Sequence, residues 1–145
     1  MYNYTVTVFN NLNGMWYPHV LTGVHLDRDR GSLLRRYGPE CSERAALIVK
    51  TEEADGQIMV GGLPWFPPKA WQTQQVPEES ITFAVGDFFM AGEWEGTEPI
   101  PDSDYVDRRD DGFAAYLIRT RDFVFRVTSV SGPFHVMPHI EVTGA

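Results

Sequence analysis

The segment YTVTVFN, residues 4–10, decides the fold class of this chain. Its tyrosine and valines alternate with two threonines, and such an alternation predicts a β-strand with one buried face. The segment NNLNG, residues 10–14, supplies asparagine and glycine, which adopt positive φ readily and favour a tight turn. The segment MWYPHVLTGVHL, residues 15–26, then returns as a second strand, in which Pro18 indicates a sheet edge or a bulge. Residues 4–26 therefore predict a β-hairpin.

The alternating pattern recurs further along the chain and predicts five more strands. In FVFRVTSV, residues 123–130, it places Phe123, Phe125 and Val127 on one face. The predicted strands are residues 44–52, two short strands within residues 80–94 around a turn at residues 85–87, residues 123–130, and a final strand at residues 135–144.

One short helix is predicted at residues 111–122. Phe113, Tyr116, Leu117 and Thr120 follow the three- and four-residue spacing of a helix face. Aspartates stand at its start and arginines at its end, the order that the helix dipole favours.

Three long connections separate these elements, near residues 27–44, 61–80 and 93–111. The first leaves room for one helical turn at residues 32–37. The second holds four prolines with two tryptophans and a phenylalanine between them, which excludes a central strand or a long helix. We expect these aromatic rings to pack into the core; the alternative is a proline-rich ligand for a recognition domain, which would leave them exposed. The sequence thus predicts a single mainly β domain over residues 1–145, a small β-barrel or sandwich of about seven short strands with one short helix and long loops.

The composition is that of an ordinary globular protein, with 43% apolar and 22% charged residues among 145. Cys41 is the one cysteine, so an internal disulfide is excluded and a reducing compartment is indicated. We see no basic leader and no apolar run of about 20 residues, so a soluble protein is expected. An incidental role for Cys41 is favoured over a catalytic thiol, because no histidine is near it in the sequence.

Charge is distributed unevenly along the chain. The net charge of −8 argues against a surface that binds nucleic acid throughout. Residues 78–111 contain eleven acidic and two basic residues, whereas residues 28–44 contain five arginines and three acidic residues. A loop that carries Arg28, Arg30, Arg35 and Arg36 can face phosphate groups, although alternating Asp and Arg more often neutralise one another at a surface.

The segment HVMPHIEVTG, residues 135–144, raises the question of a metal site. In a strand, Val136, Ile140 and Val142 share one face, and His135, His139, Glu141 and Thr143 share the other. Residues four apart in a strand lie about 13 Å apart, too far for both histidines to bind one zinc ion at about 2 Å, and Pro138 blocks the helical alternative. His139 and Glu141 could still join a site completed by His19 or His25. A terminal strand with a polar outer face is the favoured interpretation.

No other catalytic signature is found in the sequence. A nucleophile elbow, a phosphate-binding glycine loop and a C-x-x-C motif are all absent. The carboxylates of residues 93–111 lack the glycine and the terminal glutamate of a calcium loop. We therefore expect no enzyme, no metal and no cofactor.

Three features together resemble a family of small minor structural proteins from the head–tail gene modules of long-tailed phages and prophages of Gram-positive bacteria. They are a Pro-Lys-aromatic motif, a Gly-Asp turn between strands with a further glycine after it, and a closing strand led by a histidine. The matching positions are Pro68, Lys69 and Trp71, then Gly86, Asp87 and Gly92, and then His139. The resemblance runs nearly the full length of the chain, although the arginine-bearing loop at residues 27–44 is not part of the pattern.

The resemblance implies a β-barrel in the neck of the virion, assembled in the cytoplasm of the host bacterium. Its copies would form a ring with portal or adaptor proteins on one side and tail proteins on the other, with packaged DNA passing through the lumen and no membrane involved. The implied role is head completion, as a stopper or connector. A tail-completion (tail terminator) protein at the same junction is one alternative, and a metal-dependent enzyme that uses His139 and Glu141 is the other.

Overall fold

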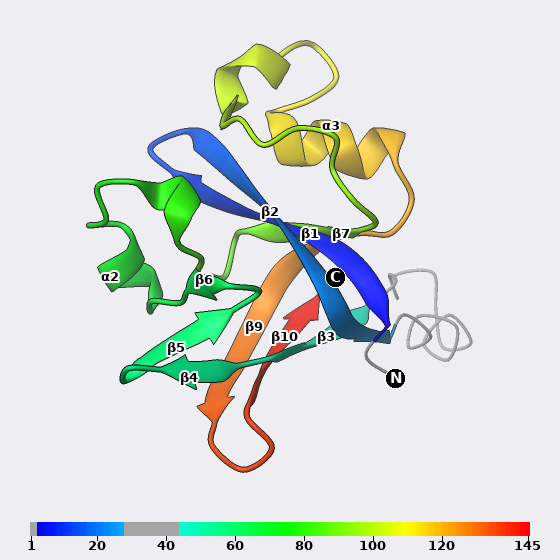
Figure 1. Ribbon diagram of the computed structural model, residues 1–145. Coiled ribbons are helices and arrows are strands. Elements are labelled where there is room, and N and C mark those ends of the chain that lie inside the picture. The colour runs from blue at the N-terminus through cyan, green and yellow to red at the C-terminus, as the bar shows by residue number, and fades with distance from the viewer. Residues whose placement is uncertain (1–2, 28–43) are drawn as a thin grey trace.

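The computed structural model describes residues 3–27 and 44–145. Within these residues the chain forms ten strands, two α-helices and two 3-10 helices (Figure 1). They are β1 (Tyr4–Leu12), β2 (Met15–Asp27), β3 (Ala45–Lys50), β4 (Glu52–Ala54), β5 (Gln57–Val60), β6 (Leu63–Pro64), α2 (Pro68–Trp71), η2 (Pro77–Glu79), β7 (Phe88–Ala91), β8 (Ile100–Pro101), η3 (Asp102–Tyr105), α3 (Phe113–Thr120), β9 (Val124–Phe134) and β10 (His139–Gly144).

Six of the strands close into a barrel. They follow the order β1-β7-β9-β10-β3-β2, and β2 pairs back with β1, while β8 adds to β2 outside the ring. Every one of these pairings is antiparallel. The predicted mainly β fold is confirmed, and of the barrel and the sandwich it is the barrel that forms. A separate three-stranded sheet, β4-β5-β6, lies beside it (Figure 1).

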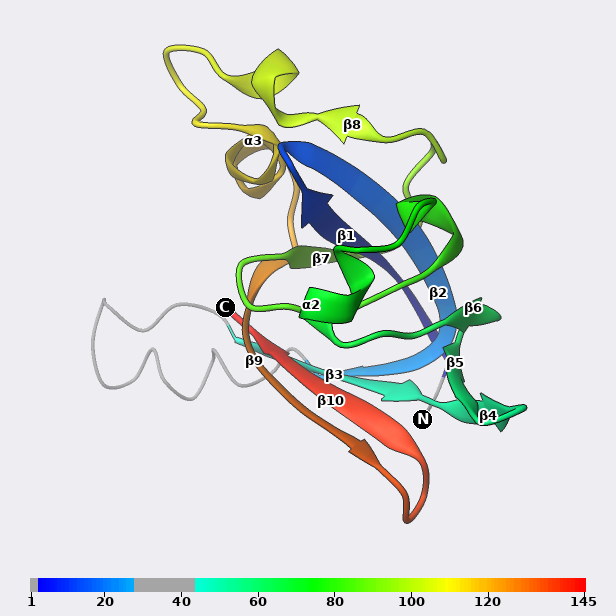
Figure 2. The ribbon, with the colours of Figure 1, turned by 90° about the vertical axis from the view of Figure 1, so that its left-hand side faces the viewer.

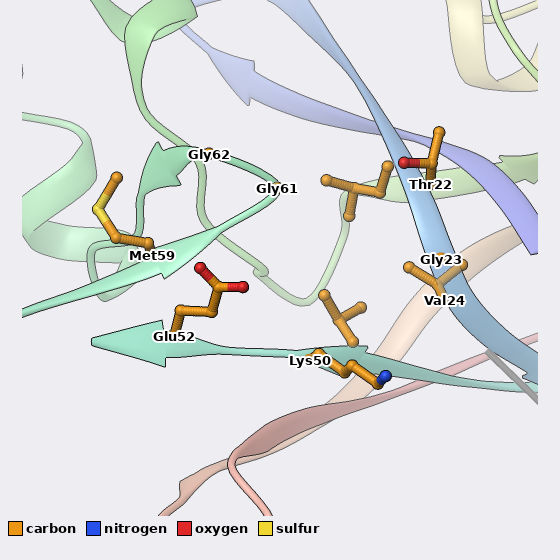
Figure 3. A pocket seen from close by; sticks show the side chains of 10 residues that line it. Thr22, Gly23, Val24, Lys50, Glu52, Met59, Gly61 and Gly62 are labelled. Atoms are coloured by element: carbon orange, nitrogen blue, oxygen red, sulfur yellow. The ribbon is translucent and has the colours of Figure 1, made fainter. Parts of the chain in front are cut away.

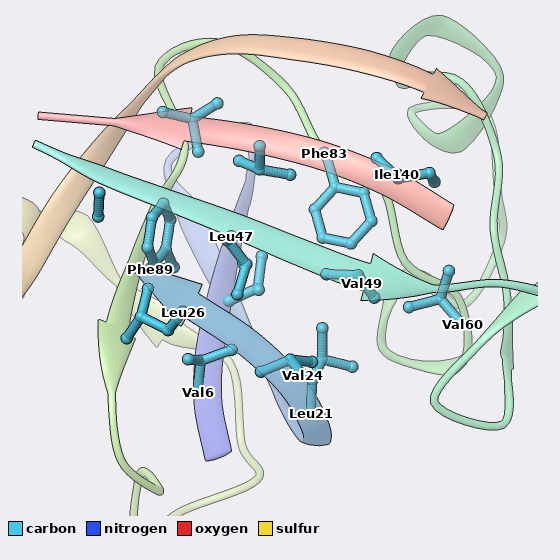
Figure 4. Packing of buried hydrophobic residues seen from close by; sticks show 14 of the residues in the cluster. Val6, Leu21, Val24, Leu26, Leu47, Val49, Val60, Phe83, Phe89 and Ile140 are labelled. Carbon is cyan, nitrogen blue, oxygen red and sulfur yellow. The ribbon is translucent and has the colours of Figure 1, made fainter. Parts of the chain in front are cut away.

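Apolar side chains from all six barrel strands fill the interior (Figure 4). Alternation along each strand sends every second residue inward, as in β10, where Ile140 and Val142 are buried and Glu141 is exposed. The interior cluster contains Val6, Val8, Leu21, Val24, Leu26, Ala45, Leu47, Val49, Val60, Ile81, Phe83, Phe89, Phe125, Val127, Ile140 and Val142.

A second apolar cluster covers the outer face of β1, β2 and β7. Phe9 stacks on Phe88 at a centroid distance of 4.6 Å and meets the edge of Phe113 from α3 at 5.4 Å. The sequence predicted one buried face for the first strand, but Thr7 and Phe9 on its other face are fully buried because this second cluster covers them. The predicted helix is confirmed as α3, which buries Phe113, Ala114 and Leu117, whereas Thr120 is exposed.

Asp102 fixes the acidic segment against the barrel and caps α3. Its Oδ1 accepts hydrogen bonds from the Trp16 indole and from the backbone N–H of Phe113, both at 2.9 Å. Gly112 has φ of 124°, and a Cβ there would lie 2.6 Å from this oxygen, so glycine is required at the start of the helix. One carboxylate thus joins β2, η3 and α3.

Residues 64–87, which we call the barrel plug, cover one opening of the barrel (Figure 2). Ile81 and Phe83 reach the interior cluster, and Trp71 is 1% exposed. The Trp71 ring meets that of Tyr17 edge-on, and its Nε1–H donates to the Ser80 carbonyl. The prediction that these aromatic rings pack into the core is confirmed for Trp71 and for half-buried Trp65, which packs against the interior cluster, while Phe66 is half-buried.

The strand predicted before the turn at residues 85–87 does not form. Residues 80–87 make only isolated bridges, and β7 is the one strand of the predicted pair. The Asn10 side chain replaces a neighbouring strand here, because its Nδ2 donates to the Thr82 carbonyl at 2.7 Å and its Oδ1 accepts from the Thr82 N–H at 3.3 Å.

Two side chains assigned to buried strand faces are exposed. Phe123 adopts φ of 61° just before β9 begins and is 42% exposed, because this left-handed conformation breaks the alternation with Phe125 and Val127. Val136 lies in the turn between β9 and β10 rather than in the last strand, and is 84% exposed.

We expect Gly144→Ala to lower the free energy of unfolding by about 1–3 kcal/mol. A Cβ at this position in β10 would lie 2.8 Å from the Phe89 ring, 2.9 Å from the Phe125 Cβ and 3.0 Å from the Arg126 carbonyl, so the barrel wall must shift. Urea unfolding measures the loss. Gly96→Ala is the control, since the nearest atom to a Cβ there is 3.5 Å away, and equal losses in both variants would contradict the packing described.

Candidate functional site

The structure does not bring the site residues predicted from the sequence together. Arg28, Arg30, Arg35 and Arg36 lie outside the described residues, as does Cys41, so the role of the arginine loop stays a prediction. Pro68 is the first residue of α2, and Gly86 and Gly92 adopt positive φ on either side of β7. The positions that carry the family resemblance lie in three parts of the molecule and do not form one site. The barrel plug contains Pro68, Lys69, Trp71, Gly86 and Asp87, while Gly92 follows β7 and His139 begins β10.

His139 and Glu141 do meet on the outer face of β10. The His139 Nε2 lies 3.2 Å from Glu141 Oε1, and its Nδ1 lies 2.6 Å from the Met137 carbonyl oxygen. The hydrogen bond to Met137, together with Glu141, raises the pKa of His139 above its ordinary value. The predicted polar outer face is confirmed by this pair and by exposed Thr143.

The histidines named for a metal site lie in different places. His19 is buried inside the barrel, His25 stands opposite Ile48 in the β2–β3 pairing, and His135 is exposed in the hairpin turn. Across residues 3–27 and 44–145, no group of three His, Cys, Asp or Glu side chains is placed to hold a metal ion.

The β9–β10 hairpin projects from the barrel and carries an apolar tip, which we define as residues 134–137 (Figures 1 and 2). Phe134, Val136 and Met137 are 41%, 84% and 79% exposed. The His139 ring stacks on Phe134 at 4.8 Å while it holds the Met137 carbonyl. His139 thus contacts the Phe134 ring and the Met137 carbonyl, while the side chains of Val136 and Met137 present an apolar surface to the solvent.

A pocket opens in the barrel wall between β2 and β3 (Figure 3). These strands pair only at residues 25–27 of β2 and 46–48 of β3, so beyond this point β2 leaves β3 to follow β1. The cavity has a volume of about 190 Å³. We call it the seam pocket; its lining is Leu21, Thr22, Gly23, Val24, Val49, Lys50, Glu52, Met59, Gly61 and Gly62.

The seam pocket combines an apolar floor with a polar rim. Leu21, Val24 and Val49 belong to the barrel core, while Thr22, Lys50 and Glu52 are exposed at the mouth. The β5–β6 turn crosses the opening, and a Cβ on Gly61 would lie 2.8 Å from Leu21, so glycine lets the turn lie directly on the core. Chemically, this arrangement suits an apolar group with a hydrogen-bonding neighbour.

The strands on one side of this pocket, β4 and β5, are not predicted by the sequence patterns. The sequence predicts an irregular connection over residues 54–80, but β4, β5 and β6 form a three-stranded sheet there. The signal was present as Asp55-Gly56, which adopts φ of 52° and 79° and connects β4 to β5. An Asp-Gly pair between two short strands is a strong hairpin signal.

The acidic segment at residues 93–111 is anchored by arginines of α3 and its end. Arg119 donates two hydrogen bonds to Asp110, at 2.9 and 2.8 Å, and Asp110 is 3% exposed. Arg121 lies over the Trp94 ring at 4.9 Å and pairs with Glu95 at 3.1 Å. We expect a solvated acidic loop here; most of the segment is indeed exposed, and β8, η3 and these pairs order part of it.

Two buried titratable groups lie where the barrel plug meets the barrel. Asp87 accepts hydrogen bonds from the Asn10 side chain at 3.0 Å and from the Asn11 N–H at 3.2 Å, yet burial raises its pKa to about 6. Burial lowers the pKa of His19 on β2 to about 4. Among the described residues, His19 Nε2, Trp65 Nε1, Ser80 Oγ and Thr82 Oγ1 are buried without a hydrogen-bond partner. This burial is not predictable from the sequence, because an aspartate after a glycine is typical of an exposed turn.

Comparison with known proteins identifies the family to which the chain belongs. Among the described residues, no helix has the length and apolar character needed to span a membrane. None of the curated proteins and none of the solved structures matches the chain. A family model described as a family of unknown function (DUF6751) matches residues 1–145. The chain therefore belongs to this family of unknown function, DUF6751.

Proposed function

We propose that this protein is a structural component of the neck of a long-tailed phage, a head-completion or stopper protein whose copies form a ring between the portal or adaptor and the tail. The resemblance of the Pro68–Trp71 segment, the Gly86-Asp87 turn and the closing strand to minor structural proteins of head–tail modules supports this role. The protein would work in the virion after assembly in the host cytoplasm.

The observation that carries the proposal is the closed β-barrel with an apolar-tipped hairpin projecting from it. An exposed apolar surface that the fold holds in place is typical of a site for protein–protein contact. In a ring, such a projection would contact a neighbouring copy or a neck protein while the barrel stays intact.

The charge distribution supports passage of DNA rather than tight binding to it. The acidic segment with α3 lies at the end of the molecule opposite the hairpin (Figure 1). Carboxylates cannot pair with phosphates, so a lumen lined by this segment would let DNA move without retaining it. Arg28, Arg30, Arg35 and Arg36 would then contact DNA locally or an acidic neighbour, and the second is our preferred assignment.

Electron microscopy of particles from a phage that lacks this gene tests the proposal. A stopper predicts heads that have leaked their DNA together with separate, finished tails, and a plasmid copy of the gene should restore complete virions. Full heads with defective tails would assign the protein to tail completion instead. Normal virions would overturn the neck assignment.

A further inference from the structure

We propose that a groove in the acidic segment binds an arginine-bearing segment of a partner protein. The groove, which we call the acidic groove, is lined by residues between 94 and 105, where β8 and η3 lie next to α3 at one end of the molecule (Figure 2). Binding there concerns the chemistry of a partner and does not depend on the neck assignment.

The walls of the acidic groove are apolar and aromatic. Half of its ten lining residues are Trp94, Pro99, Ile100, Pro101 and Tyr105. Its volume of about 500 Å³ falls within the roughly 300–1,000 Å³ of sites that bind small ligands. The groove is thus large enough for a long side chain of a partner.

The fold holds both aromatic rings of the groove in place. Trp94 packs edge-to-face with Phe9 and Phe113 at centroid distances of 5.7 and 5.4 Å. Its backbone N–H donates to Thr7 Oγ1 at 3.0 Å. The Tyr105 ring packs on Phe113 at 4.8 Å. Both rings are only half-buried by these contacts, so part of each remains in the groove.

The charges around the groove select a cation. Glu95, Glu98 and Asp104 line it, and none of its ten lining residues, all within the described part of the chain, is basic. Glu95 pairs with Arg121, whereas exposed Glu98 and Asp104 have no ion-pair or hydrogen-bond partner among the described residues. The net charge of −8 adds a longer-range attraction for a basic partner.

An arginine of the same chain shows which cation suits this chemistry. The Arg121 guanidinium lies 4.9 Å from the centroid of the Trp94 ring and pairs with Glu95 at 3.1 Å. Arg121 is not one of the lining residues, so this pairing does not fill the groove. A planar guanidinium stacks on an aromatic ring and also forms paired hydrogen bonds with a carboxylate, which an ammonium group does not. The groove offers aromatic rings beside carboxylates to an arginine of another protein.

A protein segment fits the groove better than a free cation. The Trp94 indole N–H donates no hydrogen bond to any described residue. The ring edge that carries it lies next to Gly96 of the groove lining, where a Cβ would be 3.5 Å from Nε1. A backbone carbonyl beside the bound arginine can accept this hydrogen bond, whereas a free guanidinium or ammonium ion has no acceptor.

In the proposed ring, a neck protein bound in this way would cover residues 94–105. The lumen would then be lined by exposed acidic residues beyond the groove, such as Asp107 and Asp111.

Titration with short peptides, followed in proton–nitrogen correlation spectra of the labelled protein, tests the proposal. The probe is a blocked five-residue peptide with one arginine among glycine and serine, and its control carries citrulline, the neutral isostere of arginine. The arginine peptide is expected to shift the indole resonance of Trp94 saturably, with a Kd of about 1 mM. The citrulline peptide is expected to leave this resonance in place.

Two double variants with the same change in net charge locate the site. Glu98→Gln with Asp104→Asn should raise the Kd for the arginine peptide by roughly 1.5- to 5-fold for each carboxylate, as is typical of exposed ion pairs. Glu53→Gln with Glu78→Gln is the matched control and should leave the Kd almost unchanged, because both residues lie outside the groove. All four side chains are exposed, so both double variants should fold.

Equal binding of the arginine and citrulline peptides, or an equal loss of affinity in the two double variants, would overturn the proposal. The same follows if no saturable shift is seen up to about 10 mM peptide, tenfold above the expected Kd. None of these measurements uses virions, so a failure here leaves the neck assignment to its own test by gene deletion.

Discussion

Replacement of Trp71 by alanine is expected to lower the free energy of unfolding by about 3–5 kcal/mol. Trp71 is 1% exposed and anchors the barrel plug through Tyr17 and the Ser80 carbonyl. Its removal leaves a cavity that the short helix α2 cannot close, because prolines at positions 67 and 68 restrict the backbone there. Since small domains are stable by about 5–15 kcal/mol, the loss is a large share of the total.

Urea unfolding at constant pH measures this loss. Lys69→Ala, an exposed position in the same helix, is the control and should change stability by no more than about 0.5 kcal/mol. A Trp71→Ala variant that loses less than about 1 kcal/mol would show that the plug is not packed as described.

Asp87 and His19 should give the free energy of unfolding opposite dependences on pH between pH 4 and 6. In the wild type the two should nearly cancel, although each alone is large. The pKa of Asp87 is raised from 3.8 to about 6, so its contribution to stability is present below pH 3.8 and is lost as pH rises through 6. The pKa of His19 is lowered from 6.5 to about 4, so its contribution is present above pH 6.5 and is lost as pH falls through 4. Each corresponds to roughly 3 kcal/mol, at about 1.4 kcal/mol for each pH unit.

Single substitutions should separate the two opposing slopes. In Asp87→Asn only the pH dependence of His19 remains. As pH falls from 6.5 to 4, the free energy of unfolding of this variant should decrease by about 3 kcal/mol more than that of the wild type. In His19→Leu only the pH dependence of Asp87 remains. As pH falls from 6 to 4, the free energy of unfolding of this variant should therefore increase by a similar amount. Urea unfolding at half-unit pH steps gives both profiles, with exposed Glu53→Gln as a control for the change in net charge. Profiles parallel to that of the wild type would contradict the assignment.

Local sequence patterns predicted the elements that depend on local forces. Helix α3 follows from the spacing of Phe113 and Leu117, and β10 follows from the alternation of Ile140 and Val142 with polar residues. The mainly β fold follows from several such segments. The sequence patterns do not distinguish a barrel from a sandwich. The barrel closes because β1 pairs with β2 on one side and with β7 on the other, and pairing between distant strands cannot be read from local patterns.

The errors arise where one residue overrides a pattern. Asn10 satisfies the backbone of Thr82 and so replaces a strand that the alternation predicted. A positive φ at Phe123 turns that side chain outward. Of the candidate site, the sequence supplied His139 and Glu141 as neighbours on one face, but it gave no indication of the seam pocket, whose walls come from strands far apart in the chain.

The position of β10 has a consequence for how the protein is made. This strand lies between β3 and β9, and pairs with both. A ribosome has therefore already produced β3 and β9, with Leu47 and Phe125 on their inner faces, before the strand that joins them is synthesised. Until residues 139–144 emerge, both strands have an open edge of the kind that pairs with other chains. Closure of the barrel therefore has to wait until β10, the last of its six strands, has been synthesised, and until then β3 lacks one of its two partners.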